Sequence, residues 1–331
     1  MITKIRYKNF KALCDATLPL ERFTLIVGAN GTGKTTAIKA LEIAKNPKKF
    51  YWEDVVSINE SRNKTQFVSI TIVTTNGDIS FDWSVDENGE MHGRLEKNTQ
   101  IDRSFRDIVI KNFSNFKLFT FDSEKIAEPV AIVKNMLLER DGRGLAGVLQ
   151  QLQGSEPEVF DELNNELKNW FPEFDKILFD YTDDSKIIFQ LRTTFGKHKI
   201  RAENLSDGTR LALAYLTIAY LPNPPKIVAF EEPERGIHPR LLRNIQEAMD
   251  RLAYPESFGE KREPVQVIAT THSPYLLDLY KDRREEIVIA DKDENGVHFE
   301  RLSDMPNIDE IVQDAPLGEV WYTGVLGGVP A

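Results

Sequence analysis

The chain contains very little cysteine and no long run of apolar residues. Its single cysteine, Cys14, cannot form an internal disulfide and does not make a metal site, which favours a reducing compartment. The first ten residues, MITKIRYKNF, lack the apolar core of a signal peptide, and no stretch of about 18 apolar residues is present that would form a membrane-spanning helix. We therefore expect a cytoplasmic globular protein.

An excess of positive charge is also missing. The 331 residues carry 42 Lys and Arg against 52 Asp and Glu, a formal net charge of −10. The overall field of such a protein does not steer it toward nucleic acid, so DNA binding would need a local basic patch. We interpret the basic residues near the N-terminus as solvated faces of strands and a helix, and DNA binding stays open as an alternative. These residues are Lys4, Arg6, Lys8, Lys11, Lys45, Lys48 and Lys49.

Apolar residues make up 41% of the chain, enough for a sizeable core, and their spacing in the first 97 residues predicts strands and one helix. Short strands are expected within residues 1–27, and the apolar run at 23–27 is typical of a strand buried on both faces. A helix is expected over residues 34–44. The segments 67–75 and 79–85 are rich in β-branched residues, and the Thr-Asn-Gly sequence between them predicts a hairpin.

The middle of the chain changes to helical periodicity, with helices expected at residues 144–152 and 158–170. Strands return at residues 186–200, and the final third alternates helix and strand. This order predicts an α/β core interrupted by an insert. We divide the chain into an N-terminal core part with a β lobe (1–97), a mainly helical insert (98–190) and a C-terminal core part with a terminal hairpin and tail (191–331).

Residues 28–35, GANGTGKT, fit the phosphate-loop pattern G-x-x-x-x-G-K-[ST] without exception and lie between a predicted strand and a predicted helix. The glycines let successive backbone N–H groups curl around a β-phosphate, and the helix N-terminus adds its positive end. Lys34 places a cation between the β- and γ-phosphates, and the Thr35 hydroxyl completes a Mg²⁺ shell. The predicted nucleotide-binding residues are Asn30, Gly31, Thr32, Gly33, Lys34, Thr35 and Thr36, with Lys34 also catalytic.

A second acidic element lies at residues 226–233, KIVAFEEP, where an apolar strand ends in two glutamates. In a P-loop ATPase the first acid supports Mg²⁺ through water, and the second polarises the attacking water as a general base. We therefore assign Glu231 to the metal and Glu232 to catalysis. Aspartate is the commoner first acid, so Glu231 departs from the usual pattern.

Residues 204–209, NLSDGT, precede a strongly apolar helix expected at 211–221. Ser206 is a good N-cap, and Gly208 removes a side chain where a phosphate could approach the start of the helix. By itself this is an ordinary capped helix. Because it lies about twenty residues before the acidic strand end, the segment is similar to an ABC signature turn, and Ser206 and Gly208 become candidate nucleotide-binding residues.

The strand expected at residues 265–271 leads into Thr270-Thr271-His272-Ser273-Pro274. A lone histidine after a strand is more often structural than catalytic. A neutral imidazole at this place can nevertheless hydrogen-bond a γ-phosphate and sense its loss, so His272 is a catalytic candidate. The other histidines lack this context, and we interpret His238 as part of a loop at a subunit contact.

Taken together, these motifs resemble the ABC-type ATPase heads of the RecF, SMC and OLD-like group, which includes compact bacterial AAA-type ATPases. The start Asn9-Phe10-Lys11 and the segments GANGTGKT, LSDGT, FEEPERGIHP and ATTHSP occur in the order typical of that group. The resemblance covers residues 1–75 and 190–300. It implies an α/β fold, namely a P-loop NTPase with an ABC-ATPase head, an antiparallel β lobe and a helical insert.

The resemblance also implies ATP and Mg²⁺ as cofactors and a head-to-tail homodimer held by ATP. In such heads the phosphate loop of one chain faces the signature turn of the other, so Ser206 and Gly208 would complete the γ-phosphate shell while Glu232 orients water. Adenine is expected from the family, with Phe10 or Lys11 available to pack on it. ATPases of this kind act in DNA repair and antiphage defence, often beside a separately encoded effector such as a nuclease or toxin.

Some features of the group are not matched. No Q-loop glutamine is assigned, since Gln66 is an unconvincing candidate, and no heptad pattern is long enough for an extended coiled coil. The segment Asp291-Lys292-Asp293 is superficially similar to the acidic pair of a Toprim nuclease. Strands at 287–290 and 297–302 around an Asn-Gly turn are favoured instead.

Three other functions stay open beside an ATP-hydrolysing switch. The first is an ATP-gated scaffold with little hydrolysis that holds or inhibits a partner toxin or nuclease, which Glu231 in place of aspartate allows. The second is the energising subunit of a membrane transporter, although the Asn-Phe-Lys start suits the RecF-like group better. The third is an intrinsic nuclease, for which no metal-ligand cluster outside the ATP site is evident in the sequence.

Overall fold

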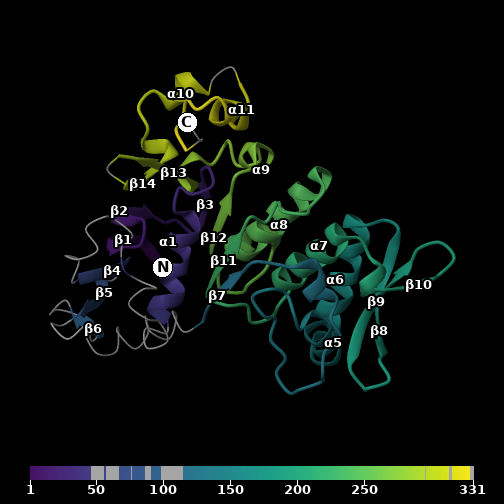
Figure 1. Cartoon of the computed structure of the whole chain (residues 1–331). Helices are drawn as coiled ribbons and strands as arrows, with labels where there is room; N and C mark the ends of the chain where they lie inside the picture. The colour runs from purple at the N-terminus through teal and green to yellow at the C-terminus, as the bar shows by residue number, and fades with distance from the viewer. Residues whose placement is uncertain are drawn as a thin grey trace. The chain divides into compact units, whose positions relative to one another are not determined.

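The computed structural model describes residues 1–45, 56, 67–75, 77–85, 91–97, 115–294, 296–312 and 315–328. The chain folds into two compact units, each built from segments that are distant in sequence (Figure 1). Unit 1 comprises Met1–Leu118, Pro225–Glu231 and Pro264–Ala331, and unit 2 comprises Phe119–Pro224 and Glu232–Glu263. One of the passages between the units therefore falls between the two glutamates of the acidic strand end.

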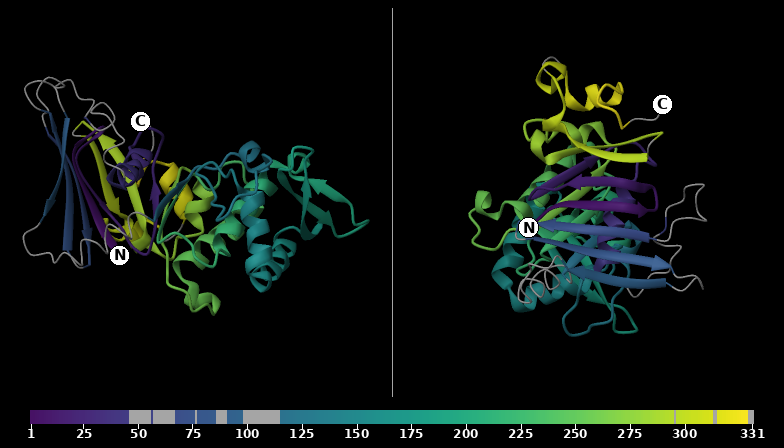
Figure 2. Two further views of the ribbon diagram at one scale, coloured as in Figure 1. Left: turned by 90° about the horizontal axis from the view of Figure 1, so that it is seen from below. Right: turned by 90° about the vertical axis from the view of Figure 1, so that its left-hand side faces the viewer.

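Unit 1 contains an antiparallel β lobe with the strand order β2-β1-β4-β5-β6, visible as neighbouring arrows in the right panel of Figure 2. The expected hairpin is confirmed, because Val73 of β4 pairs with Asp78 of β5 in an antiparallel ladder. Its turn residue Asn76 lies outside the described residues. The strands are β1 (Ile2–Phe10), β2 (Leu13–Pro19), β4 (Phe67–Thr74), β5 (Gly77–Val85) and β6 (Met91–Lys97).

The second sheet of unit 1 is mainly parallel, with the order β14-β13-β3-β12-β11-β7. Strand β3 pairs in parallel with β12 and β13, and β12 pairs in parallel with β11. Every residue of β3 and β12 is buried, as expected for strands covered on both faces. The strands are β3 (Phe23–Val27), β7 (Phe116–Phe119), β11 (Ile227–Glu231), β12 (Gln266–Thr271), β13 (Ile287–Asp293) and β14 (Gly296–Arg301).

Helix α1 (Lys34–Lys45) joins the two sheets of unit 1 into one core. Its Ala37 and Leu41 are buried in the same cluster as Ile5 and Tyr7 of β1. The Tyr7 hydroxyl donates a hydrogen bond of 3.1 Å to the Ala37 carbonyl oxygen, and burial raises the pKa of this phenol. The predicted helix over 34–44 is thus confirmed, and its apolar face anchors the phosphate loop that precedes it.

Unit 2 combines helices with a small antiparallel sheet of order β10-β9-β8. The helices expected at 144–152 and 158–170 are found as α5 and α6. Strand β8 was not predicted, because it lies within the insert that was expected to be mainly helical. The elements are α4 (Ser123–Ala127), α5 (Leu145–Ser155), α6 (Pro157–Trp170), β8 (Phe174–Tyr181), β9 (Ile187–Thr193), β10 (Lys199–Arg201), α7 (Asp207–Ala219) and α8 (Leu242–Ala253).

The C-terminal part of unit 1 contains the β13–β14 hairpin, in which Asp293 pairs with Gly296. This confirms the hairpin interpretation over a Toprim-like acidic pair. Three short helices complete the region: α9 (Pro274–Asp278), α10 (Ile308–Ile311) and α11 (Leu317–Tyr322). The chain also has the 3-10 helices 202–204, 239–241, 255–258, 284–286 and 302–304. Within the described residues, no helix has the length and apolar character needed to cross a membrane.

Candidate nucleotide site

The GANGTGKT segment forms a loop between the end of β3 and the start of α1. Gly31 and Gly33 have φ angles of +87° and +85°, a region that favours glycine because it has no Cβ. A Cβ on Gly33 would also lie 3.1 Å from the Val297 side chain and 3.2 Å from that of Leu13, whereas one on Gly31 would meet no atom within 4 Å. Gly33 is therefore required by both conformation and packing, and Gly31 by conformation alone.

Lys34 is folded back over the first turn of this loop. Its side chain is 6% exposed, and Nζ donates hydrogen bonds of 2.7 and 2.8 Å to the carbonyl oxygens of Gly28 and Ala29. The Thr32 hydroxyl donates to the same Ala29 oxygen at 2.9 Å. The loop thus holds a buried ammonium group beside its own backbone, where it can meet an incoming phosphate.

The other predicted loop residues differ in exposure. Asn30, Gly31 and Thr35 are exposed, and Thr36 is half-buried. The Ala37 N–H donates to the Gly33 carbonyl at 2.9 Å, which starts the hydrogen bonding of α1. The first N–H groups of a helix have no partner within it, so this end of α1 is suited to an anion.

The parallel pairing of β3, β12 and β11 brings three predicted parts of the site to one edge of the sheet, namely the phosphate loop, His272 and Glu231. Glu231 pairs with Thr270, and Thr271 pairs with Val27 at the end of β3. The Gly28 N–H donates to the Thr271 carbonyl at 3.4 Å. The phosphate loop, the half-buried Glu231 and the exposed residue after Thr271 therefore follow neighbouring strand ends.

His272 is the exposed residue after Thr271, and side-chain hydrogen bonds fix the turn that carries it. The Ser273 N–H donates to the Thr271 hydroxyl at 2.9 Å, and the Ser273 hydroxyl accepts from the Leu276 N–H at 3.3 Å. Ser273 is the N-cap of α9. The position of His272 is consequently set by β12 on one side and α9 on the other.

Glu232 begins the second segment of unit 2 and has an unusual backbone conformation. Its φ angle is +47°, which few residues other than glycine and asparagine adopt, and which costs on the order of 1 kcal/mol. The Arg235 N–H donates to the Glu232 carbonyl at 2.9 Å, so a turn begins here. The two glutamates are thus neighbours in sequence but belong to different units.

The predicted signature turn caps α7. The Ser206 hydroxyl accepts from the Thr209 N–H at 3.2 Å, which confirms the predicted N-cap, and the helix begins at Asp207 rather than at residue 211. A Cβ on Gly208 would lie 3.3 Å from the Gly236 carbonyl oxygen. Gly208 therefore has a packing role within the chain in addition to any role toward a phosphate.

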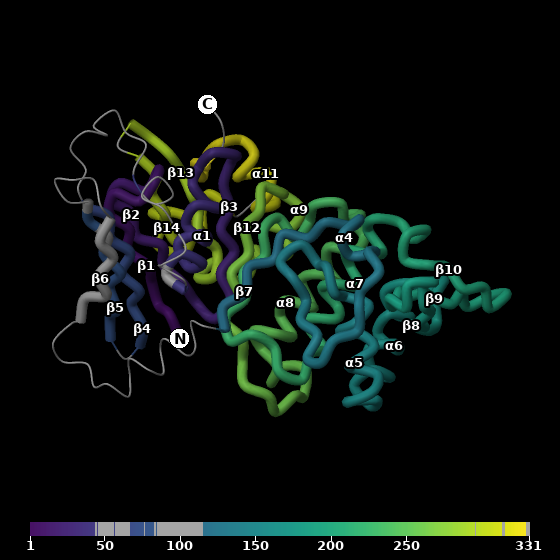
Figure 3. The backbone as a smooth tube through the Cα atoms, turned by 60° about the horizontal axis from the view of Figure 1, so that its bottom comes forward, coloured from purple at the N-terminus to yellow at the C-terminus, as the bar shows by residue number. Residues whose placement is uncertain are grey.

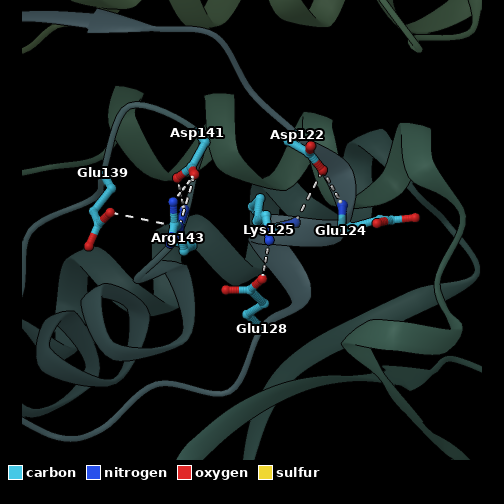
Figure 4. A network of polar contacts seen from close by, with 7 residues as sticks. All are labelled: Asp122, Glu124, Lys125, Glu128, Glu139, Asp141 and Arg143. Atoms are coloured by element: carbon cyan, nitrogen blue, oxygen red, sulfur yellow. Dashed lines mark hydrogen bonds and ion pairs between the residues drawn. The ribbon is translucent and has the colours of Figure 1, made fainter.

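Ser123 contacts this turn, and the sequence contained no signal for it. Its hydroxyl donates at 2.8 Å to Asp207, and Arg210 also bonds this carboxylate. These two bonds, first from Ser123 and then from Arg210, lower the pKa of Asp207. Ser123 directly follows Asp122, whose carboxylate caps α4 by accepting from the N–H groups of Glu124 and Lys125, within the polar network of Figure 4.

Several other sequence expectations change in the structure. Phe10 is fully buried and stacks on Tyr7 with ring centroids 6.2 Å apart, so it is not available to pack on a base. Lys45 donates to the Phe116 carbonyl at 2.8 Å, and Arg6 lies 3.6 Å from Asp78. Gln66, Lys48 and Lys49 lie outside the described residues.

His238 has a local structural role. Its Nδ1 accepts a hydrogen bond of 3.2 Å from the Arg240 N–H and caps the 3-10 helix Pro239–Leu241. The imidazole is exposed. The expected subunit contact at this loop stays a prediction.

The family profile described as "AAA domain, putative AbiEii toxin, Type IV TA system" matches residues 23–278. An OLD nuclease of Thermus scotoductus is 22% identical over 370 residues, covering 96% of this chain and 68% of the relative. Among solved structures, an SMC head bound to the C-terminal winged-helix domain of ScpA has a TM-score of 0.59 at 17% identity, covering 90% of this chain and 96% of that one. The SMC head domain from Thermotoga maritima has a TM-score of 0.49 at 16% identity, covering 91% and 98%.

The phosphate loop at the end of a fully buried strand, the acidic end of β11 and the histidine after β12 all lie within the matched residues 23–278. The chain therefore belongs to the AAA-domain family that this profile describes and has the fold of the ABC-type ATPases of the RecF, SMC and OLD group.

Proposed function

We propose that this protein binds ATP with Mg²⁺ and hydrolyses it in a head-to-tail homodimer that acts as a switch for a separate effector. The observation that carries the proposal is the phosphate loop, whose glycines have the required backbone conformation and whose Lys34 is already directed at the loop. His272 follows β12, which is adjacent to the strand that ends in this loop, and Glu231 ends β11, the next strand beyond β12. This arrangement supports the proposal, because phosphoryl transfer to water uses a phosphate-binding loop, a metal-supporting acid and polar groups near the γ-phosphate.

The residues present fit a magnesium ion. Thr35 offers an exposed hydroxyl at the start of α1, and Glu231 offers a half-buried carboxylate at the end of β11, and Mg²⁺ prefers oxygen ligands. When bound, the ion would neutralise charge on the β- and γ-phosphates. We assign Thr35 as a direct ligand and Glu231 as a support through water.

In the proposed reaction, Lys34 and the N–H groups at residues 30–36 hold the phosphates. Glu232 accepts a proton from water as its oxygen attacks the γ-phosphorus, the bond to the β,γ-bridging oxygen breaks, and ADP and phosphate leave. His272 hydrogen-bonds the γ-phosphate and responds to its loss. Ser206 and Gly208 of a second copy complete the γ-phosphate shell, so ATP holds the dimer together and hydrolysis loosens it.

Turnover tests this assignment directly. Lys34→Ala should abolish ATP binding and phosphate release, because the buried ammonium group is lost. Glu232→Gln should abolish phosphate release but retain ATP and accumulate dimers, measured by phosphate assay and by size-exclusion chromatography with light scattering. Glu158→Gln, at an exposed position of α6, is the control and should behave as wild type. Full activity in Glu232→Gln would assign the base to another residue.

The effector is proposed as a toxin or nuclease in DNA repair or antiphage defence. The family description names a type IV toxin–antitoxin system, and the relative is named a nuclease, so both names support effector chemistry beside this ATPase. Co-purification from the native host, with identification of the proteins that travel with the chain, would test it. Recovery of the chain free of any other protein at physiological salt would contradict a stable effector complex.

A second candidate is an ATP-gated scaffold that hydrolyses little and holds a partner. Glu231 in the position where aspartate is commoner favours it, because the longer side chain alters the approach to a metal-bound water. Steady-state turnover with and without the co-purified partner separates the two functions. A scaffold should bind ATP tightly and release phosphate only slowly, even when the partner is present.

A further inference from the structure

We propose that the C-terminal strap, residues 317–328, positions the phosphate loop for nucleotide binding, with Gly328 as the positioning residue. The strap consists of α11 and the glycine-rich turn after it, and it contacts the helix that follows His272 and the phosphate loop. The inference rests on the proposed function, because it concerns how the same loop meets a nucleotide. In Figure 3 the yellow C-terminal tube passes beside the purple turn that leaves β3, in agreement with the contacts below.

The first anchor of the strap is on α9, the helix that follows His272. The Gly318 N–H donates a hydrogen bond of 2.7 Å to the Asp278 carboxylate. A Cβ on Gly318 would lie 2.4 Å from the Pro274 carbonyl oxygen, so only glycine permits this close approach. Leu317 and Trp321 of α11 are buried, and α11 packs on α9.

The second anchor is on the phosphate loop itself. The Ala29 N–H donates a hydrogen bond to the Gly328 carbonyl oxygen. Gly328 has a φ angle of +69°, and a Cβ on it would lie 3.0 Å from the Ala290 oxygen and 3.3 Å from the Gly28 Cα. A Cβ on Gly28 would lie 2.4 Å from that same Ala290 oxygen. Three backbone segments thus meet here without room for a methyl group.

These contacts hold Ala29 on both sides. Its carbonyl oxygen accepts from the Lys34 ammonium group and from the Thr32 hydroxyl, while its N–H is held by Gly328. Ala29 is the second residue of the motif, and the N–H groups that cradle phosphates come later in it. The strap therefore contacts the loop at Ala29, before the N–H groups that would bind phosphates. Ordering the loop before a ligand arrives reduces the entropy lost on binding, which strengthens binding.

The decisive comparison is Gly328→Ala with Gly259→Ala in the full chain. Both glycines have positive φ angles, +69° and +75°, so both substitutions strain the backbone similarly, but a Cβ on Gly259 would meet nothing within 4 Å. Losing one backbone hydrogen bond to the loop should weaken binding of Mg-ATP and Mg-ADP about tenfold in Gly328→Ala, by titration calorimetry. Gly259→Ala should bind both nucleotides like the wild type.

Hydrogen exchange of the Ala29 amide without nucleotide tests the strap independently of ATP. The amide should exchange faster in Gly328→Ala than in the wild type, and at the wild-type rate in Gly259→Ala. If the wild type bound no nucleotide, the proposed function would fail, yet faster exchange in Gly328→Ala would still support the strap. Unchanged exchange, or tighter nucleotide binding in Gly328→Ala, would overturn the inference.

The first anchor supplies a conservative rescue. Asp278→Ala removes the acceptor of the Gly318 N–H and should also weaken nucleotide binding, whereas Asp278→Asn keeps a side-chain oxygen and should restore it. A merely structural strap would lower the melting temperature of Gly328→Ala and Asp278→Ala without changing their nucleotide affinity. That outcome would contradict a positioning role.

Discussion

At the scale of single residues, glycine and the N-cap decide the shape of the candidate site. Glycine is required at position 33 by the positive φ angle and by the close packing of Val297 and Leu13, and neither requirement involves a bound phosphate. Ser206 caps α7, and Gly208 lies against the Gly236 carbonyl. Residues that a motif assigns to a ligand thus also have roles in the fold, and mutations must separate the two.

Ser206 allows that separation. Ser206→Ala should lower the free energy of unfolding by about 1 kcal/mol, because the Thr209 N–H loses its side-chain partner. Ser206→Asp keeps an acceptor at the N-cap and should retain the stability in urea denaturation. It would also place a carboxylate beside the proposed γ-phosphate and should reduce ATP turnover. Wild-type turnover in Ser206→Asp would show that Ser206 does not approach the γ-phosphate.

At the scale of elements, unit 2 depends on a polar tie between a helix and a strand. Asn164 of α6 is 7% exposed. Its side chain donates to the Phe160 carbonyl at 2.8 Å and accepts from the Ile177 N–H of β8 at 2.7 Å. Strand β8, which was not predicted, is therefore hydrogen-bonded to helix α6, which was predicted.

Asn164→Ala should destabilise the protein by about 2 kcal/mol, because it leaves the buried Ile177 N–H without this partner. The matched control is Asn165→Ala on the exposed face of the same helix, which should change stability by less than about 0.5 kcal/mol. Urea denaturation measures the change in the free energy of unfolding for both variants. Equal effects of the two substitutions would show that the tie contributes little.

At the scale of the whole molecule, the chain passes between its two units repeatedly. The passages fall between residues 118 and 119, 224 and 225, 231 and 232, and 263 and 264. Neither unit can therefore be obtained by cutting the chain once. The passage between Glu231 and Glu232 separates the proposed metal-supporting acid from the proposed base, and it coincides with the left-handed backbone of Glu232.

The stability of the molecule in acid should depend on Asp175 in β8. Hydrogen bonds from Arg192 and Lys197 lower the pKa of this carboxylate from 3.8 to about 2. A carboxylate with a lowered pKa in the folded state contributes stability that is present above its unfolded pKa and lost as the pH falls through the folded value. The contribution of Asp175 should accordingly disappear between pH 4 and pH 2.

Asp175→Asn provides the measurement. Above pH 4 the variant should be less stable than the wild type by a constant amount in thermal denaturation, and the difference should shrink as the pH falls toward 2. Asp183→Asn, at an exposed position after the same strand, should show no such convergence. A difference that stays constant down to pH 2 would contradict the lowered pKa.

The parts of the site that the sequence predicted depend on short-range signals. The phosphate loop, the Ser206 cap and the β13–β14 hairpin are each specified within fewer than about twenty residues, by glycine conformation, side-chain capping or an Asn-Gly turn. Strand β8 escaped prediction because its burial comes from pairing with β9 and packing on α6. Phe10, one of two residues offered for packing on a base, is instead a buried ring of the core, which depends on contacts with residues distant in sequence.

The amino-acid sequence by itself determined the family, the phosphate loop and the order of the strands and helices around it, because these follow from local backbone preferences and apolar spacing. Only the tertiary structure decided that Ser123 bonds Asp207, that Glu231 and Glu232 divide between two units, and that Gly328 holds the N–H of Ala29. Such contacts join residues far apart along the chain. They depend on how the strands pair and which backbones come close, and no short stretch of sequence encodes that.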